Sequence, residues 1–214
     1  ILSSVPPAGD GSDPVLVRHG AALAASPARW LGYLSSTGVY GDAGGAWVDE
    51  ATPLAGRRDG RMAADQAWAA LHPQMRVFRL PGIYGPGRSA IDRLRAGPVA
   101  RVDLPGHVFS RIHVDDIAGA VMASIAAGGP GIYNVADDEP APGEAVTAQA
   151  ARLLGLPVPP LVPLDQAALS PMGRAFYGEC RRVANGRMKR RLGYSLKYPD
   201  YRAGLAACLM ESLP

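Results

Sequence analysis

Short apolar runs alternate with helical patterns along the N-terminal part of the chain. The predicted strands lie at 1–5, 30–36 and 75–80, and the predicted helices between them lie at about 13–25 and 60–71. Apolar residues occupy both faces of each predicted strand, which is typical of a parallel sheet covered on both sides by helices. This order of elements predicts an α/β fold with a doubly wound, Rossmann-like parallel sheet.

The elements predicted after Tyr84 are shorter, and turns rich in Pro and Gly separate them. They are helices at 88–95, from Asp115 or Asp116 to about 126, and at about 142–154, 185–193 and 200–210, with strands at 108–112 and 132–135. This change of pattern predicts a second, smaller α/β lobe towards the C-terminus. At the first helix of the chain, Asp13 precedes Pro14, which predicts an N-cap.

The composition is that of an ordinary globular protein, because 48% of the 214 residues are hydrophobic and 19% are charged. The formal net charge of +3 is too weak to indicate a nucleic-acid partner. No apolar run approaches the roughly 18 residues of a membrane span, so we expect no membrane partner. Cys180 and Cys208 lack the spacing of metal ligands. We therefore expect two idle thiols, no metal site and a cytoplasmic setting.

Four short motifs carry the candidate chemistry. They are Leu34–Gly41 (LSSTGVYG), Arg79–Arg88 (RLPGIYGPGR), Arg111–Ala118 (RIHVDDIA) and Ile132–Ala136 (IYNVA). Hydroxyl groups at the carboxyl end of a parallel strand lie where α/β sheets bind ligands, although Ser and Thr also cap strand ends without a ligand. Pro81 and Gly82 turn the backbone after a strand and leave amide groups exposed for a ligand.

As an ordered set, the four motifs resemble the extended short-chain dehydrogenase/reductase family, and within it an atypical branch of nucleoside-diphosphate-sugar epimerases. The resemblance covers nearly the whole chain. It implies NAD or NADP as cofactor, a small-molecule substrate such as a nucleotide sugar, and a homodimer formed through the two N-terminal helices. It also implies that 1–85 plus 108–135 form the C-terminal part of the dinucleotide-binding domain, with 86–107 plus 136–214 as the substrate-binding lobe.

The resemblance assigns site residues position by position. Ser36 matches the catalytic Ser or Thr that orients the substrate hydroxyl, and the adjacent Thr37 can take its place. The positions implied to contact the cofactor are Ser4, Val5, Pro6, Ser35, Pro81, Gly82, Ile83 and Tyr84. Asp13 falls near a structural Asn of the family, and a plain helix N-cap explains it equally well.

Two arginines are candidates for substrate binding. Arg88 follows the Gly-Pro-Gly turn, where a guanidinium can pair with a diphosphate. The family often has an Arg four positions before the His of the His-Val-x-Asp motif, but Phe109 stands there and Arg111 lies two residues later on the same strand face. Surface ion pairs are the alternative for Arg88 and Arg111. His113 is expected to be structural rather than an acid or base.

Two features of the family pattern are missing. No Gly-x-x-Gly-x-x-Gly turn is present to seat a dinucleotide pyrophosphate. Because Ile1–Pro7 resembles the fourth strand of the family, we expect the first three strands to lie outside this sequence. At the positions of the catalytic Tyr-x-x-x-Lys pair, counting from Ser36 leads to Arg61 and Asp65, and neither can replace a Tyr phenolate. Binding is thus better supported than redox turnover.

Three functions remain open at this point. The first is an NAD(P)-dependent epimerase, dehydratase or reductase, and the second is a non-catalytic NAD(P)-binding sensor or regulatory protein. The third, a nucleic-acid binder, would use the eight basic residues between Arg174 and Lys197, but no aromatic platform accompanies these charges. A solvated helix face or a wall for an anionic sugar nucleotide explains the same residues.

Overall fold

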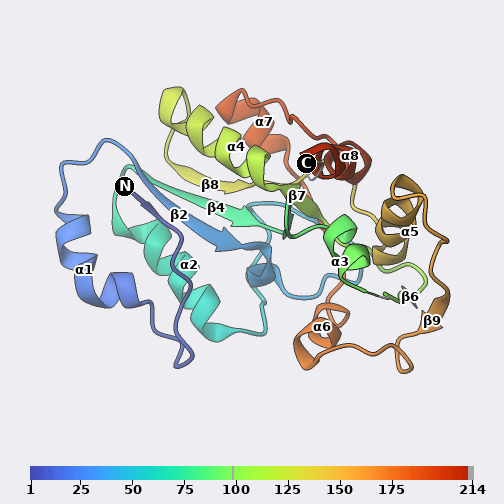
Figure 1. Ribbon diagram of the computed structural model, residues 1–214. Helices are drawn as coiled ribbons and strands as arrows, with labels where there is room; N and C mark the ends of the chain where they lie inside the picture. Colours follow the sequence, from blue (N-terminus) through green and yellow to red (C-terminus); the bar gives the residue numbers. More distant parts are fainter. Residues whose placement is uncertain (98, 212–214) are drawn as a thin grey trace.

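The computed structural model describes residues 1–97 and 99–211. Its central sheet has four parallel strands, in the order β1 (Leu2–Ser3), β2 (Leu31–Ser36), β4 (Met75–Leu80) and β8 (Gly131–Asn134) (Figure 1). The predicted α/β class and parallel sheet are confirmed. In the register of β2 and β4, the last residue of each strand is paired with the last residue of the other.

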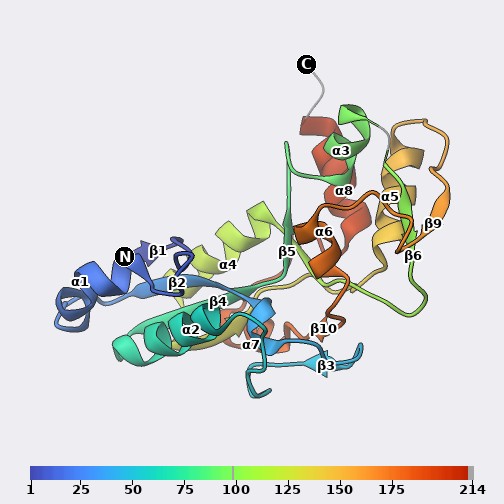
Figure 2. The same ribbon diagram turned by 90° about the horizontal axis from the view of Figure 1, so that it is seen from below.

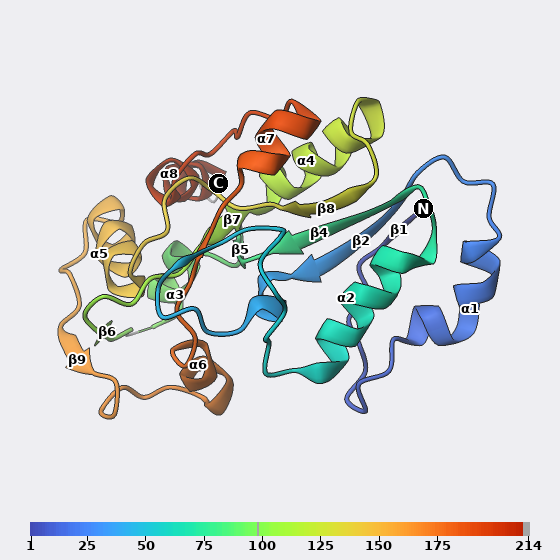
Figure 3. The same ribbon diagram turned by 180° about the vertical axis from the view of Figure 1, so that it is seen from behind.

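Helices cover both faces of this sheet (Figures 1 and 3). The helices α1 (Pro14–Ala24) and α2 (Asp59–Leu71) lie on one face, while α4 (Val114–Ala126) and α7 (Gly186–Leu192) lie on the other. Successive side chains of a strand point to opposite faces, so Tyr33 and Val77 pack beneath α2 and the alternate residues pack beneath α4 and α7. This alternation explains why the strands are apolar throughout.

The helix ends follow the capping chemistry in the sequence, with one correction. The Asp13 carboxylate accepts hydrogen bonds from the amides of Val15 and Leu16 at 3.0 and 2.9 Å, which confirms the predicted N-cap. The helix α4 was predicted to be capped by Asp115 or Asp116. Instead it begins at Val114, and His113 caps it, because its Nδ1 atom accepts from the Asp115 amide at 3.2 Å.

A smaller C-terminal lobe stands beyond the end of the sheet (Figure 2). Its helices are α3 (Ala90–Ala96), α5 (Gly143–Leu153), α6 (Pro171–Phe176) and α8 (Tyr201–Glu211), and β6 (Arg101–Asp103) pairs in parallel with β9 (Leu161–Pro163). The helices α3, α5 and α8 share one apolar core. Although α7 falls within the range predicted for the lobe, it packs on β8 and α4.

Short two-stranded ladders connect the sheet to the lobe. The strand β5 (Gly82–Tyr84) pairs with β7 (Arg111–His113), and β3 (Trp47–Val48) pairs with β10 (Arg182–Val183). The long loop predicted after β2 thus contains β3 and the 3-10 helix η1 (Thr37–Tyr40). Within residues 1–97 and 99–211, every helix is too short or too polar to cross a lipid bilayer.

Helix α8 contacts the strand-end segment closely at Gly204. A Cβ atom there would clash with the hydroxyl of Tyr84 and lie 2.7 Å from its ring carbons. We therefore expect Gly204→Ala to lower the free energy of unfolding by about 1–3 kcal/mol, because the buried contact cannot expand. Gly20→Ala is the matched control: a Cβ atom there would meet no other part of the protein within 4 Å outside its own turn of α1, and alanine should stabilise the helix by about 0.5–1 kcal/mol. Equal changes in the free energy of unfolding for Gly204→Ala and Gly20→Ala, measured by urea titration, would contradict this close contact.

Candidate functional site

The carboxyl ends of the parallel strands form one rim of the sheet, where α/β proteins bind ligands. Ser36 ends β2 and is paired in register with Leu80, the last residue of β4, so the Ser36–Thr37 and Pro81–Gly82 segments lie side by side. Next to β2, the chain leaves β1 through Ser4, Val5 and Pro6, which are exposed. The structure thus brings three of the predicted cofactor segments to the same rim.

The hydroxyl of Ser36 is half-buried and partly occupied. It accepts a hydrogen bond from the Gly38 amide at 3.1 Å and so caps η1. Because the oxygen accepts in this bond, the hydroxyl hydrogen remains available to donate to a ligand. Thr37 is only 3% exposed. Of the two hydroxyls, that of Ser36 is therefore the more accessible at the rim.

Ser35 points to the opposite face of the sheet and belongs to a buried polar network. Its hydroxyl donates to Asp65 at 2.6 Å, and the same carboxylate accepts two hydrogen bonds from the Arg79 guanidinium at 2.6 and 3.1 Å. Arg79 also donates to the Tyr40 hydroxyl at 2.9 Å, and Tyr40 donates to the side-chain oxygen of Asn134 at 2.7 Å. The network joins β2, α2, β4, η1 and β8.

This network gives Asp65 a structural role. Its carboxylate is 0% exposed and lies in a bidentate ion pair with Arg79, so it cannot contact a cofactor as the family's Lys does. Ser35, at 7% exposure and bonded to Asp65, offers its side chain to the same interior rather than to the rim. Arg61 lies one helical turn before Asp65, on the same side of α2, and is half-buried near the N-terminal end of the helix.

A second group of charged side chains, formed by Glu179 with Arg57 and Arg181, lies near the rim. The sequence motifs did not predict it. Glu179 accepts from Arg57 at 2.6 Å and from Arg181 at 2.6 Å. Burial acts to raise the pKa of Glu179, but the hydrogen bonds from both arginines outweigh it and hold the pKa below its ordinary value. Arg181 also donates to the Gly41 carbonyl at 2.6 Å, and a Cβ atom on Gly38 would lie 4.0 Å from its guanidinium and 3.3 Å from the Ser36 hydroxyl. The Arg181 guanidinium therefore lies beside Gly38, two residues after Ser36.

The segment after β4 divides into exposed backbone and a buried side chain. Gly82 is exposed, and its amide donates to the Ser110 carbonyl at 3.2 Å. Tyr84 is 8% exposed and packs edge-on against His113, with ring centroids 5.2 Å apart. Burial raises the pKa of Tyr84 far above its usual range. Pro81, Gly82 and Ile83 can present backbone and apolar surface to a ligand, whereas the Tyr84 ring contacts the protein.

The two predicted substrate arginines differ in their surroundings. Arg88 is exposed, directly after the Gly85–Gly87 turn. Arg111 is half-buried, and its Nη1 atom donates to the carbonyls of Phe109 and Ala141, both at 2.8 Å. Burial lowers the pKa of Arg111 to about 10. Arg111 thus spans the bridge between Phe109 and Ala141 rather than forming a surface ion pair.

His113 is fully buried, in agreement with a structural role. Its ring packs at a tilt against Tyr198, with 4.2 Å between centroids, and its Nε2 atom lies 3.7 Å from the Cys208 sulfur. Burial lowers the pKa of His113, which keeps the imidazole neutral. A substrate at the rim cannot reach this ring.

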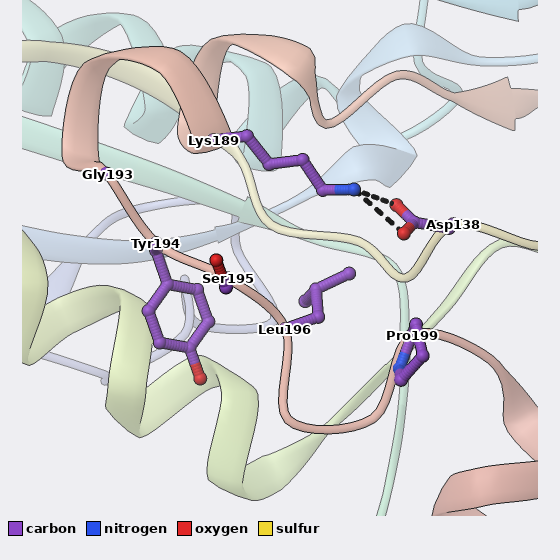
Figure 4. Close-up of a pocket in the computed structure, with 7 residues that line it drawn as sticks. All are labelled: Asp138, Lys189, Gly193, Tyr194, Ser195, Leu196 and Pro199. Carbon is purple, nitrogen blue, oxygen red and sulfur yellow. Dashed lines mark hydrogen bonds and ion pairs between the residues drawn. The ribbon is translucent and has the colours of Figure 1, made fainter.

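The basic side chains between Arg174 and Lys197 have several different surroundings. Lys197 pairs with Asp115 and Lys189 with Asp138, while Arg187, Arg190 and Arg191 line a pocket of about 310 Å³ together with Asp49, Glu50 and Ala51. A second pocket of about 360 Å³ lies beside the end of α7 (Figure 4). Its walls include the Lys189–Asp138 pair, at 2.6 and 2.8 Å. No predicted site residue lines either pocket.

The residues of the rim fit one end of a dinucleotide. The exposed backbone at Gly82 can face a nicotinamide amide, while the Ser36 hydroxyl can donate to a substrate oxygen. The glycine-rich turn that binds the pyrophosphate is not found in this sequence. This rim is therefore the candidate place for the nicotinamide end of a cofactor.

Comparisons with known proteins agree with this geometry. No protein-family model matches the chain. A protein of unknown function from Silicibacter pomeroyi DSS is 52% identical, with a TM-score of 0.91 over 98% of this chain and 77% of its own. The structure described as a candidate NAD-dependent epimerase/dehydratase from Methylobacillus flagellatus is 28% identical, with a TM-score of 0.68 over 92% of this chain and 69% of its own.

A curated relative, the 3-diazoavenalumate denitrifying reductase of a Streptomyces species, is 35% identical over 140 residues. The match covers 60% of this chain but only 45% of that reductase, so the chain spans less than half of its length. The ordered motifs, the parallel sheet and the solved relatives lead to one assignment. The chain shares the fold of NAD-dependent epimerase/dehydratase proteins and is similar to the extended short-chain dehydrogenase/reductase family.

Proposed function

We propose that this chain provides the nicotinamide-facing and substrate-binding parts of an NAD(P)-dependent oxidoreductase or epimerase that acts on a small polar molecule. The observation that carries the proposal is the register that sets Ser36 beside Pro81–Gly82 at one rim of the sheet. Solved proteins of this fold are described with NAD and with NADPH, and the curated relative is named as a reductase. A nucleotide sugar remains one candidate substrate.

The chemistry supplied by a bound nicotinamide is the transfer of a hydride. In this proposal the Ser36 hydroxyl orients a substrate oxygen, since its own oxygen already accepts from Gly38. Arg61 and Arg181 contribute positive charge at the rim, which stabilises negative charge that develops on a substrate oxygen. A guanidinium stays protonated and cannot shuttle a proton, so neither replaces the family's Tyr as an acid or base.

We propose that one lobe binds the cofactor and the other binds the substrate. Residues 1–85 and 108–135 hold the cofactor, and 86–107 with 136–214 hold the substrate, with Arg88 and Arg111 on the substrate side. The proposed homodimer would use α1 and α2, where Val17 is 77% exposed.

The test is cofactor binding and turnover in the full-length protein. We expect NADH or NADPH to bind, measured by calorimetry, and Ser36→Ala to lower the rate of substrate reduction by about 10- to 1,000-fold while the cofactor Kd changes little. Ser195→Ala, an exposed serine outside the rim, is the matched control and should leave the rate unchanged. Absence of binding by both dinucleotides would overturn the proposal.

A second candidate is a non-catalytic NAD(P)-binding sensor. The burial of Asp65 in its pair with Arg79 favours it, because the position counted for the catalytic Lys is structural. The two candidates differ in one measurement. Cofactor binding without change of nicotinamide absorbance, across nucleotide sugars and other polar substrates, supports the sensor, whereas turnover that depends on Ser36 excludes it.

A further inference from the structure

A polar pocket lies beside β8, the outer strand of the central sheet, and no residue of the Ser36 rim lines it. The pocket has a volume of about 310 Å³ and lies between α7 and the segment Asp49–Ala51. Its other lining residues are the arginines Arg187, Arg190 and Arg191. The volume is at the lower end of the range for ligand pockets, which suits a small ligand or one group of a larger ligand.

The three arginines of this pocket share one face of α7, because positions 187, 190 and 191 are three and four residues apart. All three are exposed. Among residues 1–97 and 99–211, no carboxylate forms a salt bridge with any of them. Like charges at this spacing repel one another on a helix, so an anion bound between the guanidiniums would relieve the repulsion.

Stabilisation of the helix does not explain where these charges lie. Basic side chains stabilise the last turn of a helix, where the carbonyl groups lack partners. Arg187 lies in the first turn of α7 instead. The Arg190 guanidinium turns back towards that first turn, because a Cβ atom on Gly186 would lie 2.8 Å from its Nη1 atom. Two of the three arginines therefore direct charge to a place that the helix itself does not favour.

Two carboxylates line the same pocket, and backbone amides already bind both. The Glu50 Oε1 atom accepts from the Asn134 amide at 2.8 Å, and burial raises the pKa of Glu50, although this bond and the charge of Arg187 oppose the shift. The Asp49 Oδ1 atom accepts from two amides of its own turn, at 3.0 and 3.1 Å. Three guanidiniums against two carboxylates leave the pocket with a net positive charge.

We propose that this pocket binds the diphosphate group of a small anion, and that Arg187, Arg190 and Arg191 bind its oxygens. A guanidinium binds phosphate oxygens in a bidentate manner, and a diphosphate offers more oxygens and more charge than a carboxylate. Free pyrophosphate and the diphosphate of a nucleotide share this chemistry, and the experiment below distinguishes them. The site is separate from the Ser36 rim, so the inference goes beyond the proposed function.

The experiment measures the Kd of inorganic pyrophosphate for the full-length protein by calorimetry, with and without an excess of NADH or NADPH. We expect pyrophosphate to bind about tenfold more tightly than acetate, because acetate can occupy only one guanidinium. The Kd should be the same when the dinucleotide is present. ADP is measured in parallel: tighter binding of ADP assigns the pocket to a nucleotide, and equal binding assigns it to the diphosphate alone.

Variants of α7 test which side chains bind the anion. Arg187→Met and Arg191→Met should each raise the Kd of pyrophosphate about tenfold, because each removes charge-assisted hydrogen bonds. Arg187→Lys keeps the charge but loses the bidentate geometry, so its effect should be smaller. Lys189→Met is the matched control: it removes a positive charge from the same helix, but Lys189 points into the other pocket and pairs there with Asp138 (Figure 4). Its Kd should change less than about twofold, because salt screens the more distant charge.

Three outcomes would overturn the inference, provided that circular dichroism shows each variant to be folded. The first is unchanged pyrophosphate affinity in Arg187→Met and Arg191→Met. The second is loss of pyrophosphate binding when NADH or NADPH is added, which would place the anion in the dinucleotide site. The third is a single-stranded oligonucleotide that binds more tightly than ADP through the same arginines, which would indicate a nucleic-acid surface. Pyrophosphate binding through these arginines, in a protein that binds neither dinucleotide, would contradict the proposed function alone.

Discussion

Replacement of Arg79 by Met is expected to lower the free energy of unfolding by about 3–5 kcal/mol, as measured by urea titration. Arg79 is 3% exposed, and it is the bidentate partner of Asp65, which is 0% exposed. Without the guanidinium, a carboxylate remains in the interior with only the Ser35 hydroxyl beside it. The Tyr40 hydroxyl loses a donor as well. The large effect comes from leaving the Asp65 carboxylate buried without a counter-charge. It does not measure the net contribution of the ion pair to stability.

Two further variants distinguish this explanation from a general loss of charge. Lys189→Met breaks the pair between Lys189 and Asp138, whose side chains are 39% and 41% exposed, and should cost less than about 1 kcal/mol. The double variant Asp65→Leu/Arg79→Met removes both charges and should recover much of the loss. Similar costs for Arg79→Met and Lys189→Met would show that the Asp65 pair is not desolvated as the structure indicates.

The sequence was sufficient to predict the central sheet, because long strands covered on both faces carry a strong apolar signal. The strands predicted at 30–36 and 75–80 differ from β2 and β4 by at most one residue. Short elements were missed: β6 and β9 have three residues each, too few for a periodic pattern. Their pairing with each other was not visible along the chain because more than fifty residues separate them.

The candidate site was predicted where it depends on strand ends and missed where it depends on distant contacts. Ser36 ends one parallel strand and Gly82 comes just after the neighbouring one, so their shared rim could be inferred from strand order alone. Counting along the chain located Asp65 on the correct helix, but it could not reveal the buried pair with Arg79. The bond from Arg57 to Glu179 and the edge-on contact of Tyr177 with Phe109 join segments far apart in sequence.

The second large effect concerns the pH dependence of stability and the carboxyl group of Asp137. This side chain is 2% exposed, and both its oxygens lack a hydrogen-bond partner within the described residues. Burial raises the pKa of Asp137 to about 8, although the charge of Arg111 and the nearby Glu139 backbone oppose the shift. In the unfolded chain the pKa of an Asp is about 4. Between these values the native protein retains a proton that the unfolded chain has released.

The sign of the effect follows from this difference. The contribution of protonated Asp137 to the free energy of unfolding is fully present below about pH 4. It is lost as the pH rises towards about 8, at up to roughly 1.4 kcal/mol per pH unit. We expect Asp137→Asn to flatten this slope, and to be more stable than the parent protein by several kcal/mol near pH 8, because the amide is neutral in both states. Urea titrations between pH 5 and 9 measure both curves.

Asp103→Asn is the control for Asp137→Asn, because it removes an exposed carboxylate on β6 and should leave the slope of the parent protein unchanged. Asp138 and Asp200 act with burial to raise the Asp137 pKa, so the difference between the Asp137→Asn and parent curves isolates the single proton at Asp137. Parallel curves for the two proteins would mean that Asp137 is ionised in the native state. Its carboxylate would then have to be stabilised by Arg111, and that guanidinium would be less available to bind a substrate anion.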